Sequence, residues 1–119
     1  MNESQQQIAF VKWFKEAYPT VQIWHIPSGA IIGGRNKFGL IAQLKSMGWV
    51  NGIPDLFIPS WGVWIEFKTE KGKLSSAQQE QLDYLNICGY TAIVVYGLES
   101  AKESVTALSS PNLRYSLGK

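Results

Sequence analysis

Three charged residues lie inside or directly before two short apolar segments of this chain. Asp55 precedes the apolar run at 56–58, and Glu66 and Lys68 lie at the end of the run at 63–68. Because desolvating an unpaired charge is costly, such charges need partners or a task. Residues two apart in a strand point to the same face, so Glu66 and Lys68 should project together, about 6 to 7 Å apart along the backbone. If the Asp55 strand lies alongside, the three groups form a divalent-metal site suited to phosphodiester hydrolysis.

The remaining sequence alternates between patterns typical of helices and of strands. Helices are predicted at residues 4–18, 38–47, 75–88 and 98–108, and strands at residues 21–26, 55–58, 63–68 and 91–96. Pro19, Gly48 and Gly89 supply the helix ends. This order predicts an α/β fold with a small mixed β-sheet flanked by helices.

Side chains at helical or strand spacing predict the core. In the first helix, one apolar face should contain Val11, Phe14 and Tyr18, widened by Ile8, Trp13 and Ala17. Trp13, Trp24 and Trp64 lie on predicted elements and should be buried. Trp61 lies in the predicted turn between two strands, so it is the best exposed candidate for stacking on unpaired bases.

Length and composition bound the alternatives. A chain of 119 residues predicts a single domain over 1–119, with residues 109–119 left unassigned. The hydrophobic content of 45% argues against disorder. One cysteine, Cys88, excludes an intrachain disulfide, and with the single histidine it is too little for a Cys/His zinc site. The sequence shows neither a membrane-length apolar run nor a signal peptide, so we expect a cytoplasmic protein.

Four sequence blocks in close order resemble a known family. They are Gly-Ile-Pro-Asp-Leu at 52–56, Trp-Ile-Glu-Phe-Lys at 64–68, Gly-Lys-Leu-Ser-Ser-Ala-Gln at 72–78, and Gly-Tyr at 89–90. Together they resemble the VRR-NUC branch of the PD-(D/E)XK nucleases, over about residues 3–105. The resemblance implies a restriction-endonuclease-like fold and metal-dependent cleavage of branched DNA such as flaps and junctions. Stand-alone members of this size are phage or bacterial proteins, and several are homodimers.

The candidate catalytic residues combine physical argument with this resemblance. Asp55 and Glu66 would bind Mg²⁺ or Mn²⁺ through oxygen, and Lys68 would support the attacking nucleophile or the charge on the phosphate. The resemblance adds the carbonyl of Phe67 and the carboxylate of Glu3 as further metal ligands. The alternatives are a turn aspartate at Asp55, a surface ion pair of Glu66 with Lys68, and a helix-dipole role for Glu3.

Gln78 has two possible roles. It belongs to the third block, and it shares a helical face with Leu82 and Leu85, so its amide should point inward and could position water or a phosphate. However, Ser75-x-x-Gln78 also forms a capping box, which alone would explain both residues.

Basic residues flank the acidic site and are candidate DNA contacts. They are Arg35, Lys37 and Lys45 before it, and Lys71 and Lys73 after it, with His25 as a further phosphate or DNA contact. The alternative is an ordinary solvated surface, because the net charge is only +2. The glycine-rich segment at 27–37 lacks the Lys-[Ser/Thr] pair of a P-loop, which argues against ATP binding.

We therefore predict a metal-dependent, structure-specific DNA endonuclease acting on four-way junctions or flaps as a homodimer. Two other classes remain open at this point. One is a DNA-binding protein of the same fold without useful activity, and the other is an interaction module whose Asp55, Glu66 and Lys68 form only an ion-pair network.

Overall fold

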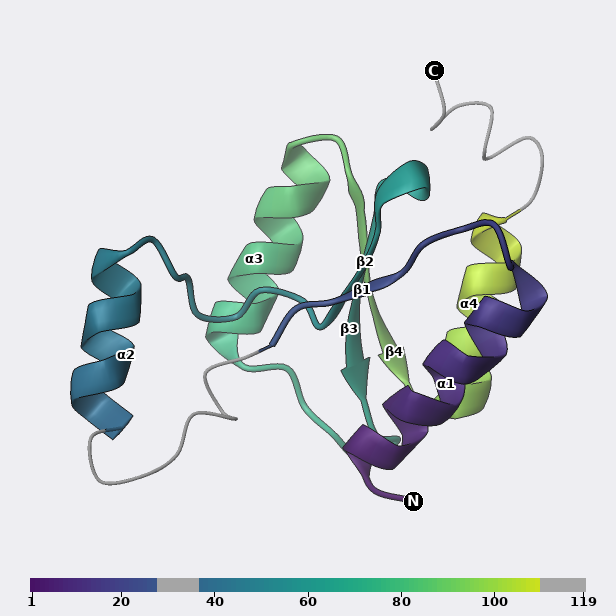
Figure 1. Cartoon of the computed structure of the whole chain (residues 1–119), viewed down its shortest axis with the longest axis horizontal. Helices are drawn as coiled ribbons and strands as arrows, with labels where there is room; N and C mark the ends of the chain where they lie inside the picture. The colour runs from purple at the N-terminus through teal and green to yellow at the C-terminus, as the bar shows by residue number, and fades with distance from the viewer. Residues whose placement is uncertain (28–36, 110–119) are drawn as a thin grey trace.

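The computed structural model of the chain describes residues 1–27 and 37–109 (Figure 1). Its elements in order are α1 (Glu3–Ala17), β1 (Trp24–His25), α2 (Lys37–Ser46), β2 (Leu56–Ile58), the 3₁₀ turn η2 (Pro59–Trp61), β3 (Val63–Lys68), α3 (Ser76–Ile87), β4 (Thr91–Tyr96) and α4 (Leu98–Leu108). None of the described helices combines the length and apolar character needed to cross a bilayer.

The strands form one mixed sheet in the order β1-β2-β3-β4. β1 pairs with β2 and β2 with β3 in antiparallel fashion, whereas β3 and β4 are parallel. η2 joins β2 to β3, and Gly62 closes it in the left-handed region at φ 66°. The predicted α/β fold with a small mixed sheet is confirmed.

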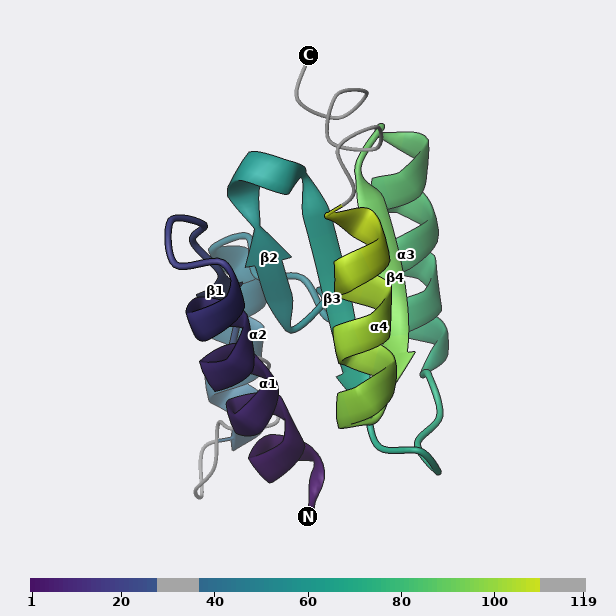
Figure 2. The same ribbon diagram turned by 90° about the vertical axis from the view of Figure 1, so that its right-hand side faces the viewer.

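Helices cover both faces of this sheet. α3 lies on one face, and α1 and α4 pack together on the other (Figure 1), as Figure 2 shows from the α1 and α4 side. α2 lies at one end of the molecule, beyond α3 and away from α1 and α4 (Figure 1). Capping boxes begin two helices, with Asn2 and Gln5 at α1 and Ser75 and Gln78 at α3.

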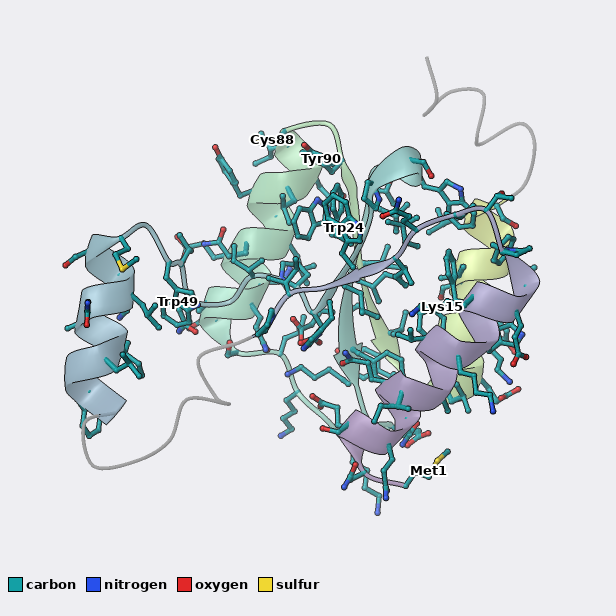
Figure 3. The ribbon with its side chains drawn as sticks, in the orientation of Figure 1. Met1, Lys15, Trp24, Trp49, Cys88 and Tyr90 are labelled. Carbon is teal, nitrogen blue, oxygen red and sulfur yellow. The ribbon has the colours of Figure 1, made fainter. Side chains whose placement is uncertain are left out.

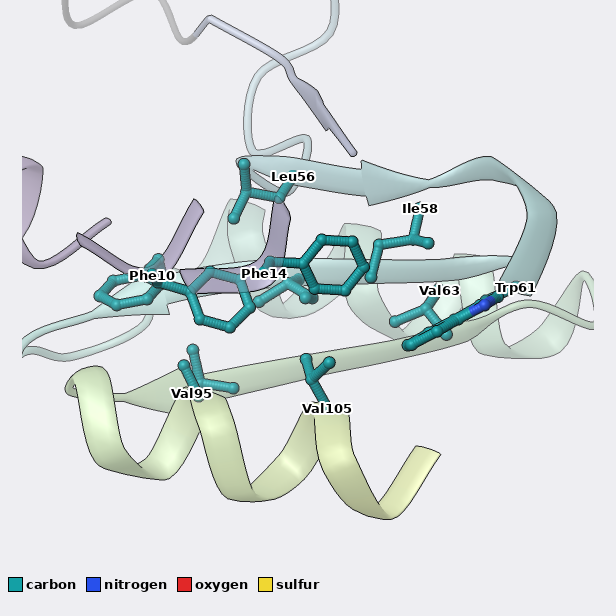
Figure 4. Packing of buried hydrophobic residues seen from close by; sticks show 11 residues of the cluster. Phe10, Phe14, Leu56, Ile58, Trp61, Val63, Val95 and Val105 are labelled. Atoms are coloured by element: carbon teal, nitrogen blue, oxygen red, sulfur yellow. The ribbon is translucent and has the colours of Figure 1, made fainter. Parts of the chain in front are cut away.

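The core fills the space between the sheet and the α1–α4 pair (Figure 4). Its fully buried side chains include Phe10 and Phe14 from α1, Ala101 and Val105 from α4, and Val63, Ile65 and Phe67 from β3. Because side chains alternate along a strand, the intervening residues of β3 face α3 instead. Trp64, Glu66 and Lys68 therefore share the sheet face opposite the core.

Some predicted details are wrong. The strand expected at 21–26 contains only Trp24 and His25, because β2 offers it a partner of only three residues. On α1, Phe14 is buried as predicted, but Ile8 is exposed and Phe10 takes the core position. Phe10 contacts Phe67 with ring centroids 5.9 Å apart. The orientation of α1 on the sheet therefore buries the face of the helix that contains Phe10 and Phe14 and leaves Ile8 exposed.

Two tryptophans exchange the roles expected for them. Trp61 is 2% exposed, because η2 folds over α1 and places its ring 5.5 Å from Phe14 and 5.1 Å from Tyr18. Trp24 is 48% exposed, because β1 is the edge strand of the sheet. The glycine-rich segment lies outside the described residues except at its ends, and so does the tail from residue 110.

Candidate active site

Asp55 is fixed by the backbone of two neighbouring strands. It lies directly before β2, where its carbonyl accepts a 2.7 Å hydrogen bond from the amide of Ile26. Its Oδ2 accepts a 2.8 Å hydrogen bond from the amide of Phe67. Extending the Leu56–Ile65 register by one residue places Asp55 opposite Glu66. The two carboxylates therefore lie side by side on the α3 face of the sheet.

Glu66 is a buried acid, with 2% of its surface exposed. Its Oε2 lies 3.7 Å from Nζ of Lys68 and accepts a 3.3 Å hydrogen bond from Nε2 of Gln78. The pKa of Glu66 is raised from 4.5 to about 8, chiefly by burial, and also by a hydrogen bond with Asp55 and the charges of Asp55 and Glu3, while the charge of Lys68 opposes the rise. The charged form of Glu66 is thus only partly compensated by the protein itself.

Lys68 is held close to this acid. Its side chain is 13% exposed. A Cβ at Gly72 would lie 3.1 Å from Cβ and 3.3 Å from Cδ of Lys68, so the chain turns tightly against the lysine stem. Gly72 is the first residue of the sequence block at 72–78, and this was the signal in the sequence for its role beside Lys68. The ammonium of Lys68 is directed toward the carboxylate of Glu66.

Glu3 reaches the same site from the first turn of α1. Burial raises its pKa, the charge of Lys68 lowers it, and the charge of Asp55 raises it further. These electrostatic effects require that Glu3 lie near both residues. The placement expected for Glu3 is therefore found, although it is close to the chain terminus.

These side chains line one cavity of about 850 Å³. The sheet and α1 contribute Glu3, Asp55, Glu66 and Lys68, and α3 contributes Gln78 from its first turn. The opposite side is formed by α2 and the segment after it, through residues that include Phe38, Ile41, Lys45, Trp49 and Asn51. Sequence reasoning missed Trp49 and Asn51, and their closeness to the block at 52–56 was the only signal for them.

The predicted DNA contacts fall in different places. Lys45 of α2 lines the cavity, whereas Lys71 and Lys73 are exposed in the turn between β3 and α3. His25 is exposed, with Nδ1 at 3.2 Å from both the carbonyl oxygen of Asp55 and Nε2 of Gln7.

Two of these candidates cannot be placed against the cavity. Arg35 lies outside the described residues. Lys37 begins α2, but its side chain is also outside them.

The donor set fits a hard divalent cation. Glu3, Asp55 and Glu66 supply carboxylate oxygens around one cavity, and oxygen ligands are those that Mg²⁺ and Mn²⁺ prefer. Because burial raises the pKa of Glu66, its ionised form is disfavoured in the protein alone, and a bound cation would stabilise that form. In the described part of the chain, no three His, Cys, Asp or Glu side chains already cluster tightly enough to hold a metal ion.

Comparison with known proteins agrees with the fold and shows the family. The described structure is an α/β sheet that carries the carboxylates of Asp55 and Glu66 and the amine of Lys68 on one face. The model of the VRR-NUC domain matches residues 1–99, and the chain belongs to this nuclease family. A solved structure of a VRR_NUC domain protein is similar over 100% of this chain and 92% of its own, with a TM-score of 0.72 and 23% identity. No curated protein sequence matches the chain.

Proposed function

We propose that this protein is an endonuclease that hydrolyses phosphodiester bonds in DNA with Mg²⁺ or Mn²⁺ as its cofactor. The observation that carries the proposal is the convergence of Glu3, Asp55, Glu66 and Lys68 on one cavity. Asp55 and Glu66 would hold the ion, with Glu3 and the carbonyl of Phe67 as further ligands. The bound cation would polarise the phosphate and lower the pKa of the attacking water.

The side chains of the chain itself have distinct tasks in this reaction. The Phe67 amide fixes Asp55 in one orientation, so its carboxylate is preorganised. Gln78 donates to Oε2 of Glu66 and so orients the second carboxylate. The Lys68 ammonium lies in the same cavity, where it can stabilise negative charge that develops on the nucleophile or the phosphate.

Substitution of the three central residues tests this function. Asp55→Asn, Glu66→Gln and Lys68→Ala should each abolish cleavage of labelled flap, fork, four-way and single-stranded DNA while circular dichroism stays unchanged. Glu99→Gln and Lys102→Ala are matched controls, because these residues form another Glu–Lys pair, 3.5 Å apart, on α4. Near wild-type cutting by any two of the three site variants would contradict the proposed site.

Metal removal provides an independent test. Activity should vanish in EDTA and return with Mg²⁺ or Mn²⁺, whereas the fold should persist because its core is apolar and separate from the site. Cleavage that survives EDTA would rule out the proposed cofactor. DNA binding without cleavage in either metal would instead favour a binding protein of the same fold.

We further propose that the substrate is branched DNA and that the active form is a homodimer. Exposed apolar side chains on and after α2 that do not line the cavity support an interface between two copies, with Leu40 41% and Met47 75% exposed. A two-fold dimer presents two symmetric sites, which match the two opposed strands cut in a four-way junction. Light scattering after size exclusion should give a dimer mass, and paired symmetric nicks should exceed cutting of plain duplex. A monomeric mass at micromolar concentration would contradict the dimer.

Basic residues that precede and follow Asp55, Glu66 and Lys68 in the sequence would hold the DNA backbone. They are Arg35, Lys37 and Lys45 before the site, Lys71 and Lys73 after it, and His25 beside it. Replacing Arg35 and Lys37 together by Ala should weaken DNA binding and flatten its salt dependence, because fewer counterions are released. An unchanged salt dependence would remove both residues from the interface.

A further inference from the structure

Three aromatic side chains form a row across the sheet. Register pairs Trp24 with Phe57 and Phe57 with Trp64, so all three lie on one face. Phe57 and Trp64 stack with centroids 4.1 Å apart and planes 23° apart, and Trp24 meets Phe57 at 5.9 Å and 69°. Tyr90, directly before β4, packs edge-on against both Phe57 and Trp64, with ring centroids 6.0 and 6.2 Å away. Phe57 and Trp64 form the inner part of the row, and their contacts with each other and with Tyr90 restrict their movement.

This row borders the carboxylate site on the same sheet face. Trp64 and Glu66 are two residues apart on β3, and Phe57 and Asp55 are two residues apart at β2. The aromatic row and the pair formed by Asp55 and Glu66 are thus about 7 Å apart along the strands. A nucleobase and its own phosphate can span such a distance. A DNA strand with a phosphate in this cavity could therefore place a neighbouring base over the aromatic row.

Trp24 is the accessible end of the row. It belongs to the edge strand and is exposed, while Trp64 is half-buried. Figure 3 shows Trp24 in front of the strands, and Tyr90 lies near the end of α3. The indole Nε1 donates a 2.9 Å hydrogen bond to Oε1 of Gln22, which limits rotation of the ring. Ile26, two residues further along the chain and on the same side as Trp24, lines the cavity, so the exposed ring lies beside a residue of the cavity wall.

We propose that Trp24, supported by Phe57 and Trp64, is a stacking site for an unpaired nucleobase of the DNA strand that occupies the carboxylate cavity. Aromatic rings stack on every base, so this contact would be tolerant of sequence. It requires an unpaired base, because neighbours in a duplex already cover both faces of a paired one. The site would favour a nucleotide at a branch point or in a single strand. This inference rests on the proposed nuclease function and adds a specificity-determining residue to it.

The test separates contacts to bases from contacts to phosphates. The full chain in EDTA would be titrated against a fluorescein-labelled duplex carrying a thymidine flap, and against the same duplex whose flap is abasic. Binding would be followed by anisotropy. Trp24→Ala should weaken binding of the thymidine flap about tenfold, within the range known for base stacking, and leave binding of the abasic flap unchanged. Trp24→Phe should restore most of the loss.

Controls keep the outcomes distinct. Tyr84→Ala removes an exposed aromatic side chain from α3 and should bind both flaps as the wild type does. Equal weakening on both flaps, or no weakening by Trp24→Ala, would overturn the stacking site. If the wild type nevertheless cuts DNA with Mn²⁺, the nuclease function stands. If the wild type neither binds nor cuts any of these substrates, the stacking site and the proposed function both fail.

Discussion

Gln78 joins the beginning of α3 to the buried carboxylate of Glu66. Its Nε2 donates to Oε2 of Glu66 at 3.3 Å, while its Oε1 accepts a 2.9 Å hydrogen bond from the amide of Ser75. The amide of Gln78 in turn donates to Oγ of Ser75 at 3.1 Å. The capping box and the contact with the site, which the sequence left as alternatives, therefore occur together in one side chain.

The two roles of Gln78 can be separated by comparing two alanine variants. Ser75→Ala and Gln78→Ala both break the capping box, and each should lower the free energy of unfolding by about 0.5–2 kcal/mol. Only Gln78→Ala also removes the donor to Glu66, so it alone should lower metal affinity or activity, by about 10- to 100-fold. Urea unfolding and cleavage rates over a Mn²⁺ titration would measure both effects. Equal activity losses in the two variants would mean that capping alone matters.

Gly52 holds the segment before Asp55 against the first turn of α3. Its φ is +89°, and a Cβ there would lie 2.6 Å from the backbone carbon and oxygen of Ala77. Gly52→Ala should therefore both strain the backbone and push this segment off α3, which displaces Asp55 from its place beside Glu66. We expect a loss of stability above the roughly 1–2 kcal/mol of a left-handed residue, together with a loss of cleavage.

Gly89→Ala is the matched control for this prediction. Gly89 has a similar φ of +99°, but a Cβ there would meet nothing within 4 Å. This variant should show only the backbone cost and keep its activity. If thermal unfolding and cleavage assays gave the same result for both variants, the close approach to Ala77 would have no functional consequence.

Gln6 connects α1 to α4 from inside the protein. It is buried, and its Oε1 accepts a 3.0 Å hydrogen bond from the amide of Leu98, the first residue of α4. Gly97 provides no side-chain cap for this helix. Gln6→Ala should cost about 1–3 kcal/mol in urea unfolding, because the amide loses its partner. Gln6→Glu keeps an acceptor at the helix N-terminus and should recover most of that loss; equal losses would contradict the capping role.

Much of the fold could be predicted because its signals are local. Proline, glycine and capping boxes mark helix ends within a few residues, and all four predicted helices are found. Strand alternation likewise placed Glu66 and Lys68 on one face and Phe67 in the core. These inferences need no knowledge of distant partners.

Burial depended on contacts that sequence patterns do not contain. Trp61 lies in a turn, which predicts exposure, but that turn folds back onto Phe14 and Tyr18 of α1. Trp24 lies on a strand, which predicts burial, but that strand is at the sheet edge. The sequence likewise could not predict that α2 and Trp49 form a wall of the cavity, since this depends on where one helix lies relative to the sheet.

The raised pKa of Glu66 predicts a specific pH dependence of stability in the metal-free protein. The unfolded chain releases the Glu66 proton near 4.5, whereas the folded chain keeps it up to about pH 8. The stabilising contribution of protonated Glu66 is thus full below the lower value and is lost as pH rises toward the higher one. Glu66→Gln, which cannot ionise, should therefore become more stable than the wild type in EDTA as pH rises through this window.

Urea unfolding in EDTA at several pH values between 4.5 and 8.5 would measure this difference, with Glu99→Gln as an exposed acid control on α4. The difference between Glu66→Gln and the wild type should grow with pH, whereas the difference for Glu99→Gln should stay nearly constant. Mg²⁺ added at pH 8 should raise the unfolding midpoint of the wild type, because the ion compensates the ionised carboxylate, and should have little effect on Glu66→Gln. A difference independent of pH would mean that Glu66 is already ionised at neutral pH without a metal.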